Sequence, residues 1–214
     1  AVVKITMDFI CPWCLIGEAR LRNAIEVLPE EVDVEIEWLP FELNPMMPVQ
    51  GMARNLYRSK KFGSLQRSRE LDAQTIAASK DDGVVIDYDR IFKTPNSFAA
   101  HRLSWLGARE GRQRAIVDGL LKGYFGEGRD IGDHEVLIEL AEKAGFEREN
   151  VREFLESKIG EREVRALEAS AKNAGVQAVP HFDIEGSVIL GAAASEALRE
   201  ALMDAHGRKE ERPA

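Results

Sequence analysis

The stretch Cys11-Pro12-Trp13-Cys14 decides how this chain is interpreted, because of the segments on either side of it. Before it, apolar and polar residues alternate over residues 3–9, which predicts a strand. After it, apolar residues recur at helical spacing over residues 21–28, until Pro29 ends the pattern. A second alternating run over residues 32–38 predicts another strand, and the connection is long enough for a parallel crossover.

The position of this motif predicts different roles for its two cysteines. Unpaired backbone N–H groups and the helix dipole favour negative charge at the start of a helix. We therefore expect the pKa of Cys11 to lie below the free thiol value of about 8.5, so that Cys11 attacks as a thiolate. Cys14, one turn further along, is placed to attack a mixed disulfide formed at Cys11. Pro12 fits the first helical turn, where no N–H group is required.

Two alternatives for the cysteine pair stay open. Cys-x-x-Cys is also half of a zinc site, and its other ligands would come from His101, His134, His181 and His206, none of which has zinc-site spacing. A structural disulfide within one helical turn would be strained, and its position between strand and helix would be unexplained. A redox pair explains both the spacing and the β-α-β context, and we favour it.

The rest of the chain predicts helices and then a return to strands. From about residue 53 to residue 174 the apolar spacing is helical, with Asp133 and Asn150 as candidate N-caps. Two short apolar runs around Glu185-Gly186-Ser187 predict a β-hairpin, and Ser195 is the candidate cap of a last helix. This order of elements fits one mixed sheet interrupted by a helical insertion.

Val179-Pro180 directly precedes the first strand of that hairpin. Proline cannot donate to a ladder, so it belongs at the start of a strand. A cis bond here would present the backbone groups of Val179 to an extended substrate. A trans proline that only starts a strand is the alternative.

Composition limits the classes of protein. The chain has 214 residues and a formal net charge of -8, which argues against sequence-independent binding of nucleic acid. No apolar run approaches the roughly 20 residues that span a bilayer. Two cysteines are too few for a disulfide-stapled secreted domain. No signal-peptide pattern precedes the first strand, so we expect a cytoplasmic protein without a membrane or nucleic-acid partner.

Several segments together resemble a known family. They are Asp8 to Gly17, Pro40 to Pro45, Asn96 to Leu103, Tyr124 to Ile131 and Gly175 to Phe182. Over nearly its whole length the chain is similar to the DsbA-like thioredoxin superfamily, and more narrowly to its FrnE-like branch. The resemblance implies an α/β thioredoxin fold with a large all-helical insertion, thiol-disulfide oxidoreductase activity, and Val179-Pro180 in the cis-proline position.

The resemblance and the order of elements also predict how the chain is divided. We expect residues 1–45 and 175–207 to form a discontinuous thioredoxin-like domain, residues 50–172 the helical insertion, and residues 208–214 a flexible tail. Ligand sites in parallel sheets lie at the carboxyl ends of strands, and Cys11 follows such an end. The insertion is therefore expected to cover the cysteine end of the sheet.

The candidate site extends beyond the cysteines. Asp8 can accept a proton from Cys14 or hydrogen-bond the loop, and His181 can stabilise a thiolate or face away. His101 lies on an apolar helical face, which is also typical of a core histidine. The supporting residues are Asp8, Pro12, Trp13, Val179, Pro180 and His181. The candidate walls of a substrate cleft are Glu42, Asn44, Phe98 and His101.

We interpret the chain as a thiol-disulfide oxidoreductase that acts on disulfide or dithiol client proteins or on small thiols. It needs no cofactor or metal beyond the redox-active disulfide Cys11-Cys14, and glutathione is a candidate co-substrate. The basic stretch over residues 54–69 can steer acidic partners or glutathione, although a solvated helix face is the interpretation we favour.

Two other functions remain open. The related kappa-class transferases and hydroxychromene-carboxylate isomerases use glutathione, but they have Ser where this chain has Cys11 and they lack the second cysteine. The other alternative is a peptide-binding or holdase module whose cysteines are incidental. Client binding unchanged by Cys11→Ser would favour that module.

Overall fold

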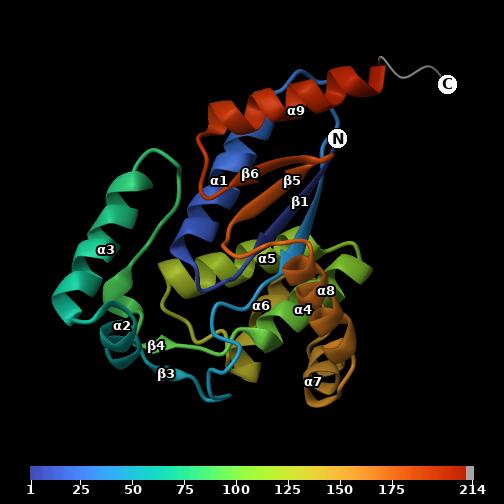
Figure 1. Cartoon of the computed structure of the whole chain (residues 1–214). Coiled ribbons are helices and arrows are strands. Elements are labelled where there is room, and N and C mark those ends of the chain that lie inside the picture. Colours follow the sequence, from blue (N-terminus) through green and yellow to red (C-terminus); the bar gives the residue numbers. More distant parts are fainter. Residues whose placement is uncertain (211–214) are drawn as a thin grey trace.

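The computed structural model describes residues 1–210 and contains a four-stranded mixed sheet in the order β2-β1-β5-β6 (Figure 1). Its strands are β1 (Val2–Met7), β2 (Glu35–Pro40), β5 (His181–Ile184) and β6 (Ser187–Leu190). β1 and β2 run parallel, whereas β1 with β5 and β5 with β6 are antiparallel. The turn of the hairpin has positive φ at both Glu185 and Gly186, as tight hairpins require. The α/β fold class predicted from the sequence is confirmed.

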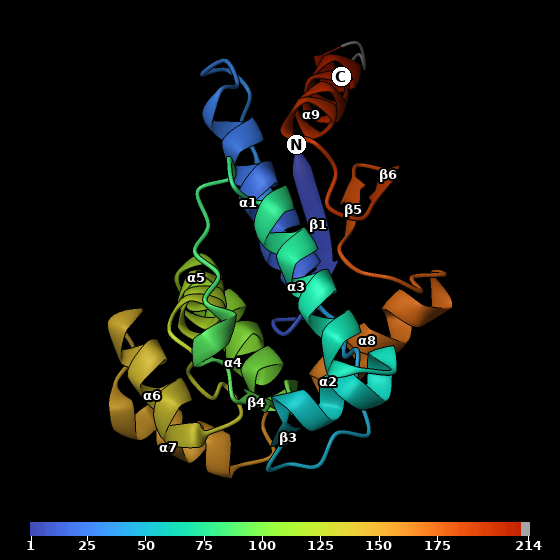
Figure 2. The ribbon, with the colours of Figure 1, turned by 90° about the vertical axis from the view of Figure 1, so that its left-hand side faces the viewer.

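Two helices, α1 (Pro12–Glu26) and α9 (Ser195–Glu210), pack against each other beside the sheet (Figures 1 and 2). α1 connects β1 to β2 and so forms the crossover of the parallel pair. α9 buries Leu198, Leu202 and Ala205, which recur at helical spacing on one face. The first turn of α1 lies at the end of the sheet that faces the insertion (Figure 1).

The segment between β2 and β5 is mainly helical. Its helices are α2 (Arg54–Phe62), α3 (Leu65–Ala78), α4 (Phe98–Arg109), α5 (Gln113–Leu121), α6 (His134–Lys143), α7 (Arg148–Glu156) and α8 (Glu161–Asn173), with the short turns η1 (Tyr88–Arg90) and η2 (Lys122–Gly126). The expectation of an all-helical insertion is wrong in one detail, because β3 (Met52–Ala53) and β4 (Lys93–Thr94) pair as a short antiparallel ladder. Strands of two residues have no alternation pattern, so the sequence contains no signal for them.

One hydrophobic core joins the sheet to the insertion. Val3, Ile5 and Met7 of β1 belong to the same cluster of buried side chains as Ile116 and Leu120 of α5. Burial of apolar surface is the dominant favourable term in folding, and this cluster is contiguous across the two parts. The insertion is therefore packed onto the sheet, and its helices hold side chains in fixed positions near the cysteines.

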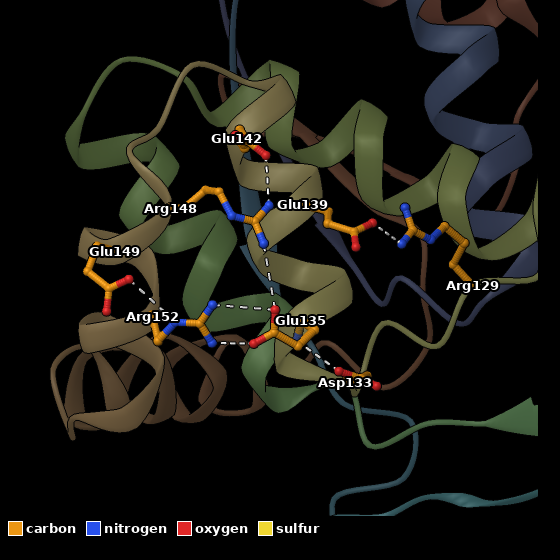
Figure 3. Close-up of polar contacts among 8 residues, drawn as sticks. All are labelled: Arg129, Asp133, Glu135, Glu139, Glu142, Arg148, Glu149 and Arg152. Carbon is orange, nitrogen blue, oxygen red and sulfur yellow. Dashed lines mark hydrogen bonds and ion pairs between the residues drawn. The ribbon is translucent and has the colours of Figure 1, made fainter.

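Ion pairs between α6 and α7 lie on the surface of the insertion (Figure 3). Arg148 Nη1 lies 2.7 Å from Glu142 Oε2, and Arg152 pairs with Glu135. Asp133 caps α6 as predicted, because its side chain accepts a hydrogen bond of 2.8 Å from the Glu135 N–H group. Exposed ion pairs contribute at most about 1 kcal/mol each. The packing of α6 and α7 therefore depends mainly on their buried apolar faces.

The second strand and α7 begin at other residues than predicted, and the first strand ends at Met7 instead of residue 9. The second strand begins at Glu35 instead of residue 32, because its partner β1 begins at Val2, directly opposite Glu35. α7 begins at Arg148, so the predicted cap Asn150 lies inside its first turn. The residue before Arg148 is extended and already occupies the cap position.

The last helix also departs from the prediction. Ser195 is the first residue of α9 rather than its cap, because the carbonyl of the preceding residue accepts the first helical hydrogen bond. Residues 208–210 are helical where a flexible tail was expected. Lys209 Nζ lies 3.0 Å from Glu185 Oε1 of the hairpin, which holds this last turn in place. Residues 211–214 of the predicted tail lie outside the described residues.

Candidate active site

Cys11 occupies the cap position of α1 and Pro12 its first turn, as the sequence predicted. The backbone of Cys11 is extended, with φ -92° and ψ 114°, and its carbonyl accepts a hydrogen bond from the Cys14 N–H group at 3.0 Å. The Cys11 N–H group donates to the Asp8 carbonyl at 3.2 Å. Cys11 is 6% exposed and Cys14 is fully buried. The end of β1 and this turn together fix both sulfur atoms.

The two thiols have opposite pKa shifts. A hydrogen bond from the Cys14 thiol lowers the pKa of Cys11 below its ordinary value, and this effect prevails over burial, which raises it. The backbone N–H groups of Cys14 and Trp13 lower the pKa of Cys11 further. Burial raises the pKa of Cys14 well above its ordinary value, and the hydrogen bond and charge of Cys11 raise it further. A thiolate therefore forms first on Cys11.

A proline loop from the other end of the chain meets Cys11. The Val179-Pro180 peptide bond is cis, as predicted. Cys11 Sγ lies 3.9 Å from the Val179 carbonyl oxygen. Backbone polar groups that an extended substrate can pair with therefore border the sulfur atom with the lower pKa.

Gly17 allows α1 to approach this proline loop closely. A Cβ atom added to Gly17 would lie 2.9 Å from Pro180 Cγ and 3.2 Å from Phe182 Cζ. Gly17 ends the segment from Asp8 that carries the family resemblance, and no role was predicted for it. A glycine inside a helix destabilises it by roughly 0.5–1 kcal/mol relative to Ala. Its presence at position 17 was therefore a signal that another segment packs closely against the helix there.

A cavity of about 290 Å³ opens beside Cys11, and we call it the front cavity. One wall is formed by Cys11, Pro12 and Trp13, and Trp13 is 39% exposed. The other walls come largely from α2, α3 and η2 of the insertion. Besides Trp13, its aromatic lining consists of Tyr57, Phe62, Tyr88, Tyr124 and Phe125. The insertion therefore borders the cysteine end of the sheet.

The charged residues that line the front cavity are three cations and one carboxylate, namely Arg54, Arg58, Lys61 and Asp72. Arg54 forms a bidentate ion pair with Asp72, at 3.0 and 2.9 Å, and Arg58 Nη2 contacts the same carboxylate at 2.9 Å. One carboxylate thus faces two guanidinium groups, which leaves positive charge uncompensated. A solvated face is the wrong interpretation for Arg54 and Arg58, whose side chains are only 10% and 12% exposed.

Asp8 and His101 form a buried pair behind the cysteines, and we call them the rear pair. Asp8 Oδ1 lies 3.1 Å from His101 Nε2, and Asp8 Oδ2 accepts a hydrogen bond of 2.8 Å from the Leu43 N–H group. The Cys14 sulfur accepts a hydrogen bond from the Asp8 backbone N–H group. His101 comes from α4, is 3% exposed, and lines a second cavity of about 160 Å³ instead of the front cavity.

Glu42 is also buried, beside Glu168 of α8. Burial and the neighbouring Glu168 carboxyl group raise the pKa of Glu42 to about 8. The Arg165 guanidinium opposes this shift from 4.0 Å, and it lies over the Phe98 ring at 4.1 Å from the ring centroid. The structure therefore groups two predicted cleft residues, Glu42 and Phe98, with α8 and outside the lining of the front cavity.

The remaining predicted residues occupy two different places. Asn44 Oδ1 accepts a hydrogen bond of 3.0 Å from the Tyr57 hydroxyl group, so Asn44 supports a residue of the front cavity. His181 is the half-buried first residue of β5 and lies opposite Thr6 of β1. Asn44 is thus connected to the front cavity through Tyr57, whereas His181 belongs to the strand that follows the proline loop.

The sequence contained one usable signal for the front cavity. Arg54, Tyr57, Arg58 and Lys61 recur at helical spacing, so their side chains share one face of α2. A stripe that mixes cations with an aromatic residue is unusual for a merely solvated face. Asp72, on which Arg54 and Arg58 converge, is one of two acids on α3 and has no comparable signal.

Both cysteine thiols are free in this structure. Within residues 1–210, no helix has the length and apolar character needed to cross a membrane. In the same range, His, Cys, Asp and Glu side chains form no group of three or more that could hold a metal ion.

Fold and site together define a class of protein. It has a mixed thioredoxin-type sheet, a Cys-x-x-Cys pair at the start of the first helix, a cis proline beside it, and a helical insertion. The family model described as DSBA-like thioredoxin domain matches residues 2–203. The chain belongs to this family.

Individual relatives agree with this assignment. The uncharacterized protein YwbO from Bacillus subtilis (strain 168) is 28% identical over 208 residues, which cover 97% of this chain and 98% of the relative. The crystal structure of the probable DsbA oxidoreductase SCO1869 from Streptomyces coelicolor matches this chain with a TM-score of 0.88 and 31% sequence identity. The match covers 100% of this chain and 92% of the SCO1869 chain. The cytosolic disulfide reductase DsbM from Pseudomonas aeruginosa, solved with GSH, shares the fold with a TM-score of 0.63 and 16% identity, over 98% of both chains.

Proposed function

We propose that the protein is a thiol-disulfide oxidoreductase in which Cys11 is the attacking thiolate and Cys14 the resolving thiol. The asymmetry of the pair carries this proposal. Cys11 borders the front cavity and has a lowered pKa, whereas Cys14 is fully buried and has a raised pKa. A nucleophile must be both accessible and ionised, and Cys11 meets these conditions better than Cys14.

The proposed reaction consists of two thiol-disulfide exchanges. In the first, the Cys11 thiolate attacks a substrate disulfide R–S–S–R′, forms a mixed disulfide with R–S and releases R′–S⁻. In the second, Cys14 loses its proton and attacks Cys11 Sγ, which closes the Cys11-Cys14 disulfide and releases R–S⁻. The substrate gains two electrons and the cysteine pair loses two. The reverse sequence oxidises a dithiol substrate.

We also propose that small anionic thiols and disulfides, glutathione among them, are substrates or recycling partners. The excess of cations in the front cavity supports this. The groups that lower the pKa of Cys11 are a thiol and two backbone N–H groups, so none of these cations is required for the thiolate. Their charge is therefore available to a ligand carboxylate. The presence of GSH in the DsbM structure is in line with this substrate class.

The test compares the wild type with Cys11→Ser and Cys14→Ser in the reduction of bis(hydroxyethyl) disulfide, a neutral substrate that does not need the cations. We expect Cys11→Ser to abolish turnover, because Cys14 is buried away from the front cavity. Cys14→Ser should retain the first attack and accumulate a mixed disulfide on Cys11, seen as added mass on the intact protein. Turnover by Cys11→Ser, or an adduct found on Cys14, would contradict the assignment.

A further inference from the structure

Glu42 and Glu168 form a buried carboxyl pair between the end of β2 and helix α8. The two residues are 7% and 8% exposed, and their side chains are hydrogen-bonded to each other. Glu168 Oε1 is buried and has no other partner among the described residues. A carboxylate only accepts hydrogen bonds, so two ionised groups cannot pair, whereas a protonated group can donate to an ionised one. The contact therefore requires one proton shared between Glu42 and Glu168.

The surroundings of the pair keep this proton in place. The charged groups that act on Glu42 are Glu168 and Arg165 of α8 and Asp8, which follows β1. Burial and the two neighbouring carboxyl groups raise the pKa of Glu42 to about 8. The cation of this set, Arg165, lies 4.0 Å from Glu42 Oε2, but its side chain is exposed and its charge is screened by water. The shared proton is therefore retained at neutral pH.

A small apolar cluster joins the same two segments and leads to the proline loop. Phe41, which precedes the first carboxyl group of the pair, packs with Ala171 and Val176. Ala171 lies on α8 one turn beyond the second carboxyl group, and its carbonyl accepts a hydrogen bond of 3.0 Å from the Val176 N–H group. Val179 packs against this cluster, and its carbonyl oxygen lies 3.9 Å from Cys11 Sγ. The carboxyl pair is thus connected to Cys11 through packed side chains.

We propose that Glu168 is a positioning residue, which shares a proton with Glu42, fixes α8 against the end of β2 and so holds the proline loop beside Cys11. The inference rests on the proposed function, because the loop affects thiol exchange only where a substrate backbone pairs with Val179. An extended peptide can form such hydrogen bonds, whereas a small disulfide without a peptide backbone cannot. Loss of the shared proton should therefore weaken the reaction with peptide disulfides and leave the reaction with small disulfides nearly unchanged.

The pH dependence separates this role from a purely structural one. Below about pH 8 the pair keeps its proton, and above that pH both carboxyl groups ionise and repel each other. The reactivity of Cys11 also changes with pH, because only its thiolate attacks. The same thiolate attacks every substrate, so the ratio of the rates for a peptide disulfide and a small disulfide cancels that change. This ratio therefore reports on the proline loop.

The experiment measures kcat/KM for two neutral substrates, the disulfide dimer of a blocked Ala-Cys-Ala peptide and bis(hydroxyethyl) disulfide. In the wild type the ratio of the peptide to the small disulfide should fall by about 3- to 10-fold between about pH 6.5 and about pH 9.5, the effect of losing one hydrogen bond. In Glu168→Gln the amide N–H group donates to ionised Glu42, so the ratio should change less than about 2-fold. Glu42→Gln supplies the same donor from the other side and should behave alike. Glu163→Gln, an exposed position on α8, is the control and should keep the wild-type response.

A second measurement follows the loop without turnover. The methyl ¹³C shifts of Val176 and Val179 should change with the titration of the pair in the wild type and not in Glu168→Gln. A ratio of rates that is independent of pH in the wild type, or a wild-type response in either folded Gln variant, would overturn the proposal, as would turnover of the small disulfide alone. If Glu168→Gln does not fold, Glu42→Gln decides. If the wild type reduces neither disulfide, the proposed function fails, and the methyl shifts still decide whether the shared proton positions the loop.

Discussion

The front cavity and the rear pair lie on either side of the same two cysteines and differ in almost every physical property. The front cavity has permanent positive charge from Arg54 and Arg58 and borders Cys11. The rear pair is buried and consists of a carboxyl group and an imidazole. Helices of the insertion supply much of both, since α2 and α3 line the front and α4 carries His101.

This difference shows how one insertion can serve two tasks. The sheet and α1 supply the cysteines and the proline loop, which are sufficient for thiol chemistry. The side of the insertion that faces Cys11 contributes the charged residues of the front cavity, and the other side contributes His101, which contacts Asp8. Variants that affect one side should therefore leave the other side intact.

The largest effect should come from Asp72→Asn in the front cavity. This change leaves two largely buried guanidinium groups without a carboxylate, which typically costs about 3–5 kcal/mol. Glu70→Gln on the same helix is the matched control, because its ion pair with Arg67 is half exposed and is worth at most about 1 kcal/mol. The free energy of unfolding in urea measures both. Similar losses for the two variants would show that Asp72 is not a buried partner.

The second prediction concerns the position of α1, on which both sides depend. Gly17→Ala should destabilise the protein by about 1–3 kcal/mol, because the new Cβ atom overlaps Pro180 and Phe182. Gly119→Ala is the control, since its nearest neighbour would be Leu140 at 3.9 Å and the change improves helix propensity. Thermal unfolding of the two variants should move in opposite directions. A stable Gly17→Ala protein with normal turnover would refute the close approach of α1 to the proline loop.

The third prediction tests whether buried carboxyl groups make the region behind the cysteines sensitive to pH. The pKa of Glu42 is raised on folding, from 4.5 to about 8. Its contribution is fully present below pH 4.5 and is lost as the pH rises through about 8, because the unfolded chain releases this proton first. Glu42→Gln should therefore gain stability relative to the wild type as the pH rises from 4.5 to 8.

Denaturant unfolding at the two pH values measures this effect. The exposed substitution Glu31→Gln is the control and should leave the pH dependence of the wild type unchanged. A Glu42→Gln protein that loses stability equally at both pH values would mean that Glu42 is ionised in the folded protein.

The fourth prediction concerns the link between the two thiols. Cys14→Ala removes the largest cause of the lowered pKa of Cys11, so that pKa should rise toward the ordinary thiol value. The alkylation rate of Cys11 at neutral pH should then fall by roughly 3- to 10-fold. Cys14→Ser keeps a hydroxyl donor and should show a smaller change. If the pH profile of Cys11 alkylation is the same in Cys14→Ala as in the wild type, the backbone N–H groups of α1, and not the Cys14 thiol, lower the pKa of Cys11.

The smallest effect should come from the charge of Lys61. Lys61→Gln should lower turnover of an anionic disulfide such as oxidised glutathione by about 2- to 5-fold, in line with the modest strength of an exposed ion pair. Turnover of bis(hydroxyethyl) disulfide should not change. Lys60→Gln, on the same helix but outside the front cavity, is the control. Equal losses of turnover for the anionic and the neutral disulfide would show that the charge of Lys61 does not determine substrate preference.

The comparison also shows how far sequence patterns reach. The cap at Asp133, the hairpin turn and the helix-start position of Cys11 follow from contacts within a few residues, and the structure agrees with the geometry predicted for each. Asn150 was placed wrongly as a cap because Glu147, three residues earlier, is extended and already occupies the cap position of α7.

The sequence by itself determined the fold class, the helix-start position of Cys11 and the proline that precedes the hairpin, because each depends on local periodicity or on backbone chemistry. Only the tertiary structure decided that His101 meets Asp8 and that Arg54 and Arg58 converge on Asp72. These contacts join segments far apart in the chain. Their existence depends on how the insertion packs onto the sheet, and the periodicity of either segment alone does not contain that information.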